Sequence, residues 1–301
     1  MNRVLSRLTF EWPTFFLLLL CYAVWALGTT VAAQLWLPLG VGLAALAAAL
    51  HSSLSHEMLH GHPTSNPLVN AALVFPALSV SIPYLRFQDM HLAHHQDAVL
   101  TDPYDDPESN YTDPAVWARL PVWFQSILKF NNSLLGRLLV GPLLGQIVFV
   151  KNDLQKIRRG HRHVLWGWLV HLPALAVVVW WMVNVASLPI YAWLLSAYLA
   201  HAILKIRTFL EHQAHEHAGG RTVIIEDKGP LALIFLNNNL HAVHHMHPNV
   251  PWYRLPMLYA AKRDSYLTRN QGYCFRSYGE IFRRYFVKSK DPVPHPLWPK
   301  P

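Results

Sequence analysis

The sequence predicts an all-α integral membrane protein with four transmembrane helices in two hairpins and a cytoplasmic, histidine-rich helical cap. Three observations lead to this fold class. Of the 301 residues, 52% are hydrophobic and only 14% are charged. In soluble domains about a quarter of the residues are charged. Four long apolar stretches are present, and the basic residues lie on one side of them. Most of the nineteen histidines lie outside these stretches, several of them in short motifs.

The four apolar stretches are long enough to be membrane helices. They cover about residues 12–31, 35–50, 165–183 and 188–204. Short links near Gln34 and Ser187 join them pairwise, so each pair is expected to form a helical hairpin. Two shorter apolar stretches, 69–83 and 134–150, contain Pro or Gly and are expected to be interfacial or re-entrant helices. We assign residues 1–290 to a single membrane domain and residues 291–301 to a Pro-rich tail that is extended or disordered.

The distribution of basic residues predicts the orientation. The links 28–37 and 183–189 contain no Lys or Arg, whereas segment 51–164 is rich in both. The positive-inside rule therefore places that segment and both termini in the cytoplasm. A cleaved signal peptide in residues 1–33 is an alternative. Cleavage would leave three spans, and the two ends of the chain would then lie on opposite sides of the membrane.

Composition also excludes several functions. The net charge of +8 is not accompanied by a zinc-finger or RNA-binding motif. The two cysteines, Cys21 and Cys274, cannot supply a disulfide scaffold or a thiolate metal site. Any transition metal must therefore be bound by His, carboxylate or amide groups.

Three histidine motifs, here called the histidine boxes, indicate a metal site. The first has the pattern HxxxH (His56–His60), and the other two have the pattern HxxHH (His91–His95 and His241–His245). Helical residues at i, i+3 and i+4 share a face, so each box offers two or three imidazoles to one point. All three boxes are expected at the same membrane surface. The predicted ligands are His56, His60, His91, His94, His95, His241, His244 and His245.

Further residues are candidates because of their position near the boxes. His212, soon after the fourth stretch, is a ninth candidate ligand. Asn237 precedes His241 by four residues and is a candidate weak ligand or hydrogen-bond partner if the helix extends that far, with a capping role as the alternative. Glu57, Glu211 and the acidic cluster after the second box could orient imidazoles, with a solvated loop as the alternative. That cluster comprises Asp97, Asp102, Asp105, Asp106 and Glu108.

The number of imidazoles indicates two metal ions, because a tetrahedral zinc site takes only four ligands. Nitrogen-rich sites suit Fe, Zn, Cu or Ni, and the residues alone do not choose among them. A metal transporter is an alternative of another class. It would need ligands at mid-span depth, where only His171 and His201 lie. For these two histidines we expect hydrogen bonds between helices.

The boxes, in this order and with hairpins between them, resemble the membrane fatty acid desaturase superfamily, which includes desaturases, alkane hydroxylases and carotenoid hydroxylases. The resemblance covers about residues 12–256. Segment 91–108, with Leu100-Thr-Asp-Pro and Asp105-Asp-Pro, is similar to the bacterial desaturase branch. The Glu211-His212 pair and Asn237 are similar to extra ligand positions in this superfamily. The first box occurs in both desaturases and hydroxylases, so it does not separate them.

This resemblance implies an oxidoreductase of lipid metabolism in a bacterial inner membrane. It implies two Fe ions, with no catalytic residue separate from the ligands, and the O2-dependent oxidation of an unactivated C–H bond in a lipid from the bilayer. It favours fatty acyl desaturation, with hydroxylation of an alkane, carotenoid or other lipid as the alternative.

The electrons for this reaction must come from a partner, because the sequence has no dinucleotide, flavin or haem motif. A ferredoxin or rubredoxin with its reductase, or a cytochrome, is expected. Arg86, Lys156, Arg158 and Arg159 could bind such an acidic protein or an anionic head group, and ordinary positive-inside flanks are the alternative.

Overall fold

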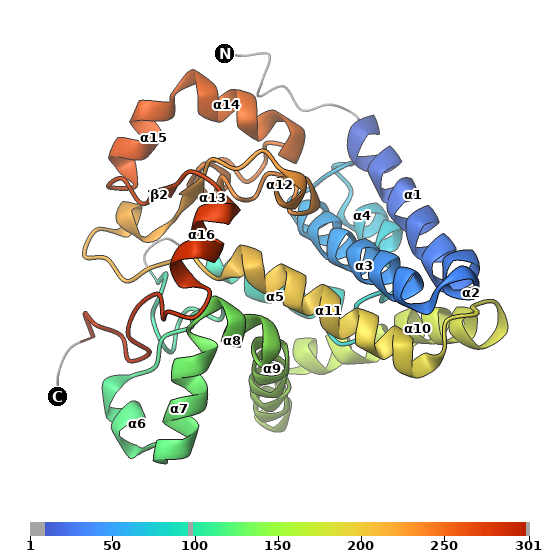
Figure 1. Cartoon of the computed structure of the whole chain (residues 1–301), viewed down its shortest axis with the longest axis horizontal. Coiled ribbons are helices and arrows are strands. Elements are labelled where there is room, and N and C mark those ends of the chain that lie inside the picture. Colours follow the sequence, from blue (N-terminus) through green and yellow to red (C-terminus); the bar gives the residue numbers. More distant parts are fainter. Residues whose placement is uncertain (1–9, 96–98, 299–301) are drawn as a thin grey trace. The chain divides into compact units, whose positions relative to one another are not determined.

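The computed structural model describes residues 10–95 and 99–298. The chain divides into two compact units, each formed from two separate stretches of sequence: 1–88 with 142–204, and 89–141 with 205–301. Within the described residues the regular structure is almost entirely helical (Figure 1), as the sequence predicts. The exception is a parallel pair of two-residue strands, β1 (Ile224–Ile225) and β2 (Cys274–Phe275).

The first unit contains the long apolar helices. Its elements are α1 (Trp12–Leu27), a π-helical turn (Gly28–Ala32), α2 (Ala33–Leu35), α3 (Leu37–Leu59), α4 (Pro67–Leu73), the start of α5 (Tyr84–His94), nearly all of α9 (Gly141–Arg158), α10 (Arg162–Asn184) and most of α11 (Ile190–Thr208). The predicted hairpins correspond to α1–α3 and α10–α11, and the first of them turns at Trp36, where the backbone is extended.

Small residues allow the two helices of the first hairpin to approach closely. A Cβ atom on Gly40 would lie 2.7 Å from the Cα atom of Ala33, and one on Gly28 would lie 3.0 Å from the backbone nitrogen of Ala44. Membrane helices commonly pack through such small residues, because lipid supplies no hydrophobic force to drive them together. The composition of these helices therefore suits close packing within a bilayer.

The link of the second hairpin is bound to the π-helical turn of the first. The carbonyl oxygen of Thr29 accepts hydrogen bonds from the backbone nitrogens of Ser187 and Leu188, both at 2.9 Å. The Thr29 hydroxyl accepts another from the indole nitrogen of Trp181 at 3.0 Å. Gln34 donates to the Ser187 hydroxyl at 2.7 Å. These bonds satisfy polar groups where the chain reverses.

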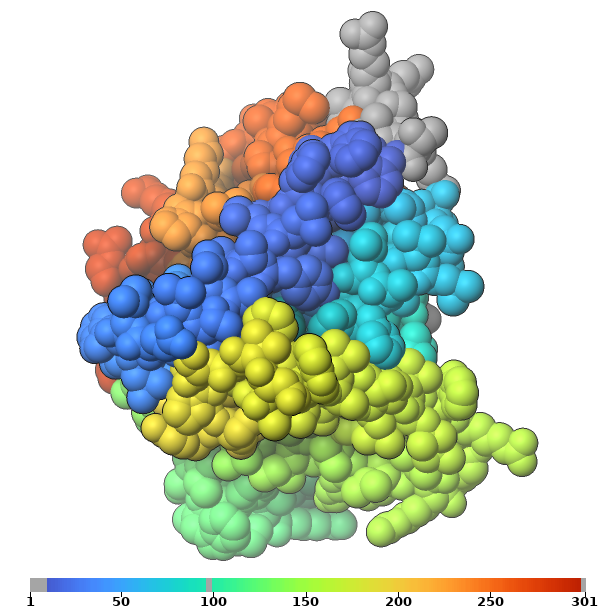
Figure 2. Space-filling view, turned by 90° about the vertical axis from the view of Figure 1, so that its right-hand side faces the viewer, coloured from blue at the N-terminus to red at the C-terminus, as the bar shows by residue number. Residues whose placement is uncertain are grey.

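Three helices of the described chain are long and apolar enough to cross a membrane: Trp12–Leu35, Leu37–Leu59 and Arg162–Asn184. Most of the first and third of these helices is not covered by other parts of the protein. Helices α1 and α10 lie at the surface on the face shown in Figure 2. The predicted fourth span corresponds to α11, which has 19 residues and carries Lys205 and Arg207 in its last turn. The fourth span therefore stays a prediction.

The predicted short helices are only partly helical. Stretch 69–83 is helical only to Leu73, the end of α4, and its remainder is an irregular segment before α5. Helices α9, α10 and α11 each supply a side chain to that segment. His171 binds the Val80 carbonyl at 2.8 Å, His201 binds the Ser79 carbonyl at 3.1 Å, and Gln146 donates to the Ser81 carbonyl at 3.0 Å. Irregular backbone at membrane depth requires such internal partners. Stretch 134–150 forms α8 and the start of α9.

Arg86 is buried, which contradicts its proposed role as a surface group for an anionic partner. Its guanidinium makes two hydrogen bonds of 2.9 Å with the Asp153 carboxylate, and both side chains are 2% exposed. The indole nitrogen of Trp168 donates to the same carboxylate at 2.9 Å. Arg86 therefore joins α5 to α9 and α10.

The second unit consists of short helices and connecting segments. Its remaining elements are α6 (Pro114–Arg119), α7 (Val122–Asn131), α8 (Leu134–Leu139), a 3-10 turn (Ala218–Arg221), β1, α12 (Pro230–Ile234), α13 (His241–Met246), a second 3-10 turn (Trp252–Arg254), α14 (Leu255–Ala261), α15 (Arg263–Arg269), β2 and α16 (Tyr278–Tyr285). A buried apolar cluster packs α13 against β1, α14 and α15. In the described part of the predicted tail, Pro294 pairs with Thr112, and the backbone nitrogen of Trp298 donates to the His295 carbonyl at 3.2 Å in a turn.

Candidate metal centre

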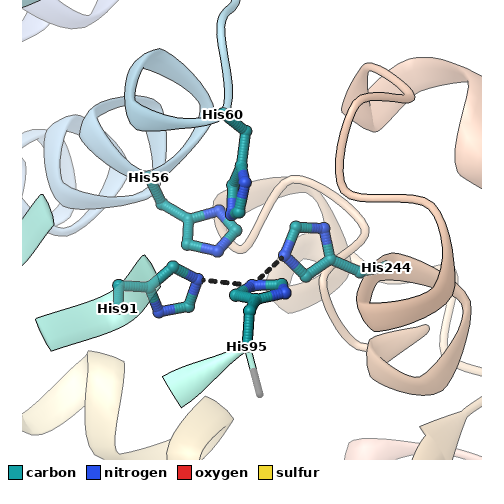
Figure 3. Close-up of side chains that lie close together, drawn as sticks. All are labelled: His56, His60, His91, His95 and His244. Carbon is teal, nitrogen blue, oxygen red and sulfur yellow. Dashed lines mark hydrogen bonds between the residues drawn. The ribbon is translucent and has the colours of Figure 1, made fainter. Parts of the chain in front are cut away.

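The second histidine box lies at the end of α5. The Nε2 atoms of His91 and His95 are 2.9 Å apart. The third box lies on α13, and from it the Nε2 atom of His244 comes within 3.2 Å of Nε2 of His95 (Figure 3). We call His91, His95 and His244 the His244 set. Its three imidazoles are aimed at one another from two elements distant in sequence.

A second group of imidazoles lies in the same unit. His94 Nε2 is 2.9 Å from His212 Nε2, and His241 Nε2 is 3.1 Å from the same atom. With His245, these residues each offer a ligand atom, and the four atoms lie within 4.8 Å of one another. We call His94, His212, His241 and His245 the His212 set. His212, which lies outside the three boxes, is therefore grouped with box residues, and its role as a ligand stays a prediction.

The two sets lie side by side. The rings of His95 and His245 are stacked, with centroids 4.3 Å apart and an interplanar angle of 15°. Because one ring belongs to the His244 set and the other to the His212 set, this contact joins the sets. The second and third boxes each divide their histidines between the two sets, as expected when i, i+3 and i+4 residues face two neighbouring points.

The opposite ring nitrogens are occupied by acidic and amide groups. His94 Nδ1 lies 2.8 Å from the Asp106 carboxylate, His91 Nδ1 lies 3.1 Å from Glu108, and His241 Nδ1 lies 2.9 Å from the Asn238 side-chain oxygen. An acceptor at Nδ1 fixes the tautomer with its proton on that atom and leaves the Nε2 lone pair available. In their neutral form the rings of His91, His94 and His241 therefore present an Nε2 lone pair.

Burial and charge favour the neutral ring at His212 and His241 and the protonated ring at His94. Burial and the neighbouring imidazoles hold the pKa values of His212 and His241 well below the usual range, so both rings are neutral. Burial lowers the pKa of His94, but Glu108 and Asp106 outweigh it and raise the pKa to about 9. The surroundings of His94 thus stabilise a positive charge, which a bound cation would also provide.

The spacing of the nitrogens fits a metal ion. Two nitrogens bound at about 2.1 Å and at right angles around one ion lie about 3 Å apart. The observed Nε2 separations of 2.9, 3.1 and 3.2 Å match that value. Facing lone pairs at this distance repel unless a proton or a cation lies between them. Imidazole sites without thiolate suit Fe, Zn, Cu or Ni.

The first box lies in the other unit. His56 is in the last turn of α3 and His60 caps it, so α3 extends past the predicted end of the second stretch. Their ring centroids are 4.8 Å apart (Figure 3). The Glu57 carboxylate is 3.8 Å from Nδ1 of His56, which is beyond a hydrogen bond. The two imidazoles share a face, as the HxxxH spacing predicts.

Of the residues expected to orient the histidines, Glu211 lies near them, whereas the Asn237 side chain has its hydrogen-bond partner elsewhere. Glu211 lies 3.8 Å from Nδ1 of His241 and 3.0 Å from Arg207, so it is near the His212 set. Asn237 is not on the helical face of His241, because α13 begins at His241 and Asn237 has a φ of 55°. Its amide donates to the Trp252 carbonyl at 3.1 Å. Asp97 lies outside the described residues.

Sequence reasoning indicated the acidic cluster after the second box but did not single out Asp106 and Glu108, and it did not identify Asn238. Asp106 is fixed by the backbone nitrogens of Thr101 and Glu108, both at 2.9 Å. The accumulation of acidic residues was the available signal for the cluster. No comparable signal distinguished Asn238 from the two asparagines beside it.

Two comparisons with known proteins bear on this site. The model of one family, described as fatty acid desaturase, matches residues 30–277. The matched region contains all three boxes and His212. No individual curated protein gave a match.

Proposed function

The chain belongs to the fatty acid desaturase family, and we propose that it desaturates a fatty acyl chain in an O2-dependent reaction at a di-iron centre. Membership of this family implies an oxidoreductase of lipid metabolism. The observation that carries the finer proposal is the pair of adjacent imidazole sets, each with Nε2 atoms about 3 Å apart. Two adjacent imidazole sets suit two metal ions.

We assign one iron to each set. The His212 set supplies four ligands to one ion. The His244 set would supply three ligands to the other ion, and the sequence motif further predicts His56 and His60 as ligands. The spacing of the first box supports this last step, because α3 presents both imidazoles on one face, and the family match includes that box.

When bound, the iron pair supplies the O2-derived oxidising power needed to attack an unactivated C–H bond. Desaturation removes two hydrogen atoms from the acyl chain. These two hydrogen atoms, two electrons from an external donor and two protons together reduce one O2 to two waters. The Asp106, Glu108 and Asn238 side chains hold the Nδ1 protons and thereby orient the imidazoles. Four of the imidazoles, those of His91, His94, His241 and His244, are about 1% exposed and are thereby shielded from water.

The membrane arrangement and the partners follow from the sequence pattern. We propose that α11 is the fourth span, that the boxes and both termini face the cytoplasm of a bacterial inner membrane, and that the acyl substrate comes from the bilayer. The exposed Lys156, Arg158 and Arg159 on and beside the end of α9 suit an acidic electron-transfer protein such as a ferredoxin, a rubredoxin or a cytochrome.

Lipid profiling tests this proposal. Cells that express the chain together with an electron donor should accumulate acyl chains that have lost two hydrogens. An acyl or terpenoid product that has gained one oxygen would instead support hydroxylation. His94→Ala and His244→Ala should each abolish oxidation and lower the iron content while leaving membrane insertion intact. A variant that retains full iron and full activity would contradict the assignment of its set.

A further inference from the structure

His212 differs from the other members of its set in its local backbone. His94 is in α5, and His241 and His245 are in α13, so helical geometry fixes these three. His212 lies on an irregular segment after α11. Tertiary contacts must therefore hold its backbone in place.

One side of this segment pairs with the residues that lead into β1. The backbone nitrogen of Gln213 donates to the Arg221 carbonyl, and that of Val223 donates to the Glu211 carbonyl, both at 3.0 Å. This pairing fixes the direction of the segment. It leaves the carbonyl of His212 and the N–H of Ala214 to other partners.

The C-terminal end of the chain supplies those partners. The Lys290 ammonium donates to the His212 carbonyl oxygen at 3.0 Å. The Tyr111 hydroxyl accepts from the Ala214 backbone nitrogen at 2.9 Å and donates to the Asp291 carboxylate. Lys290 and Asp291 therefore hold the backbone on both sides of Gln213, one directly and one through Tyr111.

These two C-terminal residues are themselves anchored. The backbone nitrogen of Lys290 donates to the Asn132 carbonyl at 3.0 Å, and the Asn132 amide donates to the Asp291 carbonyl at 2.6 Å. The Lys290 side chain is only 4% exposed. A buried ammonium is unfavourable unless it is paired. The nearby Asp291 carboxylate, at 3.7 Å, and the face of Tyr111 offset this cost.

We propose that Lys290 and Asp291 form a C-terminal latch that positions His212 for metal binding. They act through the backbone of residues 212–214, so they are positioning residues and not ligands. The inference rests on the proposed function, because it takes the His212 set as a metal site. Both residues lie beyond the region 30–277 that matches the family, so the latch is a feature of this chain outside the matched segment.

Fe(II) titration of the purified, chelator-stripped full chain tests the latch. Lys290→Met should weaken Fe(II) binding at one of two sites by about 10- to 100-fold, the usual effect of removing a group that orients a ligand. Lys290→Arg, which retains a donor, should bind more tightly than Lys290→Met. Lys288→Met is the matched control, because Lys288 is exposed and lies two residues earlier. Its affinity should equal that of the wild-type protein.

His212→Ala separates failure of the latch from failure of the proposed function. If His212→Ala and the wild-type protein bind Fe(II) equally, the metal assignment fails. If His212→Ala binds weakly and Lys290→Met binds as the wild-type protein does, the latch is wrong.

Hydrogen exchange tests the latch without any metal. In Tyr111→Phe the Ala214 amide loses its acceptor, so a peptide spanning residues 210–216 should exchange faster than in the wild-type protein. Unchanged exchange would overturn the latch even if Lys290→Met failed to fold.

Discussion

The Asp106 carboxylate lies 2.8 Å from Nδ1 of His94, and both side chains are 1% exposed. The carboxylate is itself fixed, because it accepts hydrogen bonds from the backbone nitrogens of Thr101 and Glu108. An acceptor held by backbone cannot follow a ring that rotates. Asp106 therefore sets the direction in which His94 presents its Nε2 lone pair.

Asp106→Asn should lower the affinity of the His212 set for iron by about 10- to 100-fold, because it removes the charge that orients His94 and favours a cation there. The measurement is anaerobic Fe(II) titration of the purified protein. Asp105→Asn is the matched control, since Asp105 is adjacent and exposed. Equal affinities for the two variants would show that Asp106 does not support the site.

The buried ion pair between Arg86 and Asp153 leads to a prediction about stability. Arg86→Met leaves the Asp153 carboxylate buried without its countercharge, although the Trp168 donor remains, and should cost about 3–5 kcal/mol. The double variant Arg86→Met/Asp153→Leu should recover much of that loss, because no uncompensated charge remains. Thermal melting of the detergent-purified proteins measures both. A double variant less stable than Arg86→Met would contradict this account.

How much the sequence could predict depended on whether a feature is local. The apolar stretches predicted the long helices and three of the four spans, because length and apolarity decide what a bilayer accepts. The spacing of the boxes predicted their shared faces, because helical periodicity is fixed. The partners of the Nδ1 atoms depend on turns. Asp106 contacts His94 across twelve positions of the sequence, and no helical periodicity predicts such a contact. Arg86 was misassigned because its partner, Asp153, lies 67 residues away.

His201 provides a test of the irregular segment before α5. Its imidazole contacts the Ser81 hydroxyl at 3.0 Å and the Ser79 carbonyl at 3.1 Å. His201→Leu would leave these groups without that partner in an apolar setting, at a cost of about 1–3 kcal/mol. His201→Gln, which keeps a donor, should lose less. The melting temperatures of the two variants measure the difference, with His163→Leu as an exposed control. A His201→Leu variant as stable as the wild-type protein would show that this contact contributes nothing.

Asn237 and Asn238 offer a test in which two adjacent residues of the same type should behave differently. Asn238 contacts Nδ1 of His241 at 2.9 Å, so Asn238→Ala should weaken iron binding by about 10- to 100-fold. Asn238→Asp retains an acceptor and should bind nearly as the wild-type protein does.

Asn237 instead has a φ of 55° and donates to the Trp252 carbonyl. Asn237→Gly removes that hydrogen bond without straining the left-handed backbone, so it should lower the melting temperature slightly and leave the iron affinity unchanged. Asn237→Ala would add a backbone cost of about 1 kcal/mol and is therefore the poorer comparison. Loss of iron from Asn237→Gly together with full iron in Asn238→Ala would contradict this account. Asn237, and not Asn238, would then be the asparagine that supports metal binding.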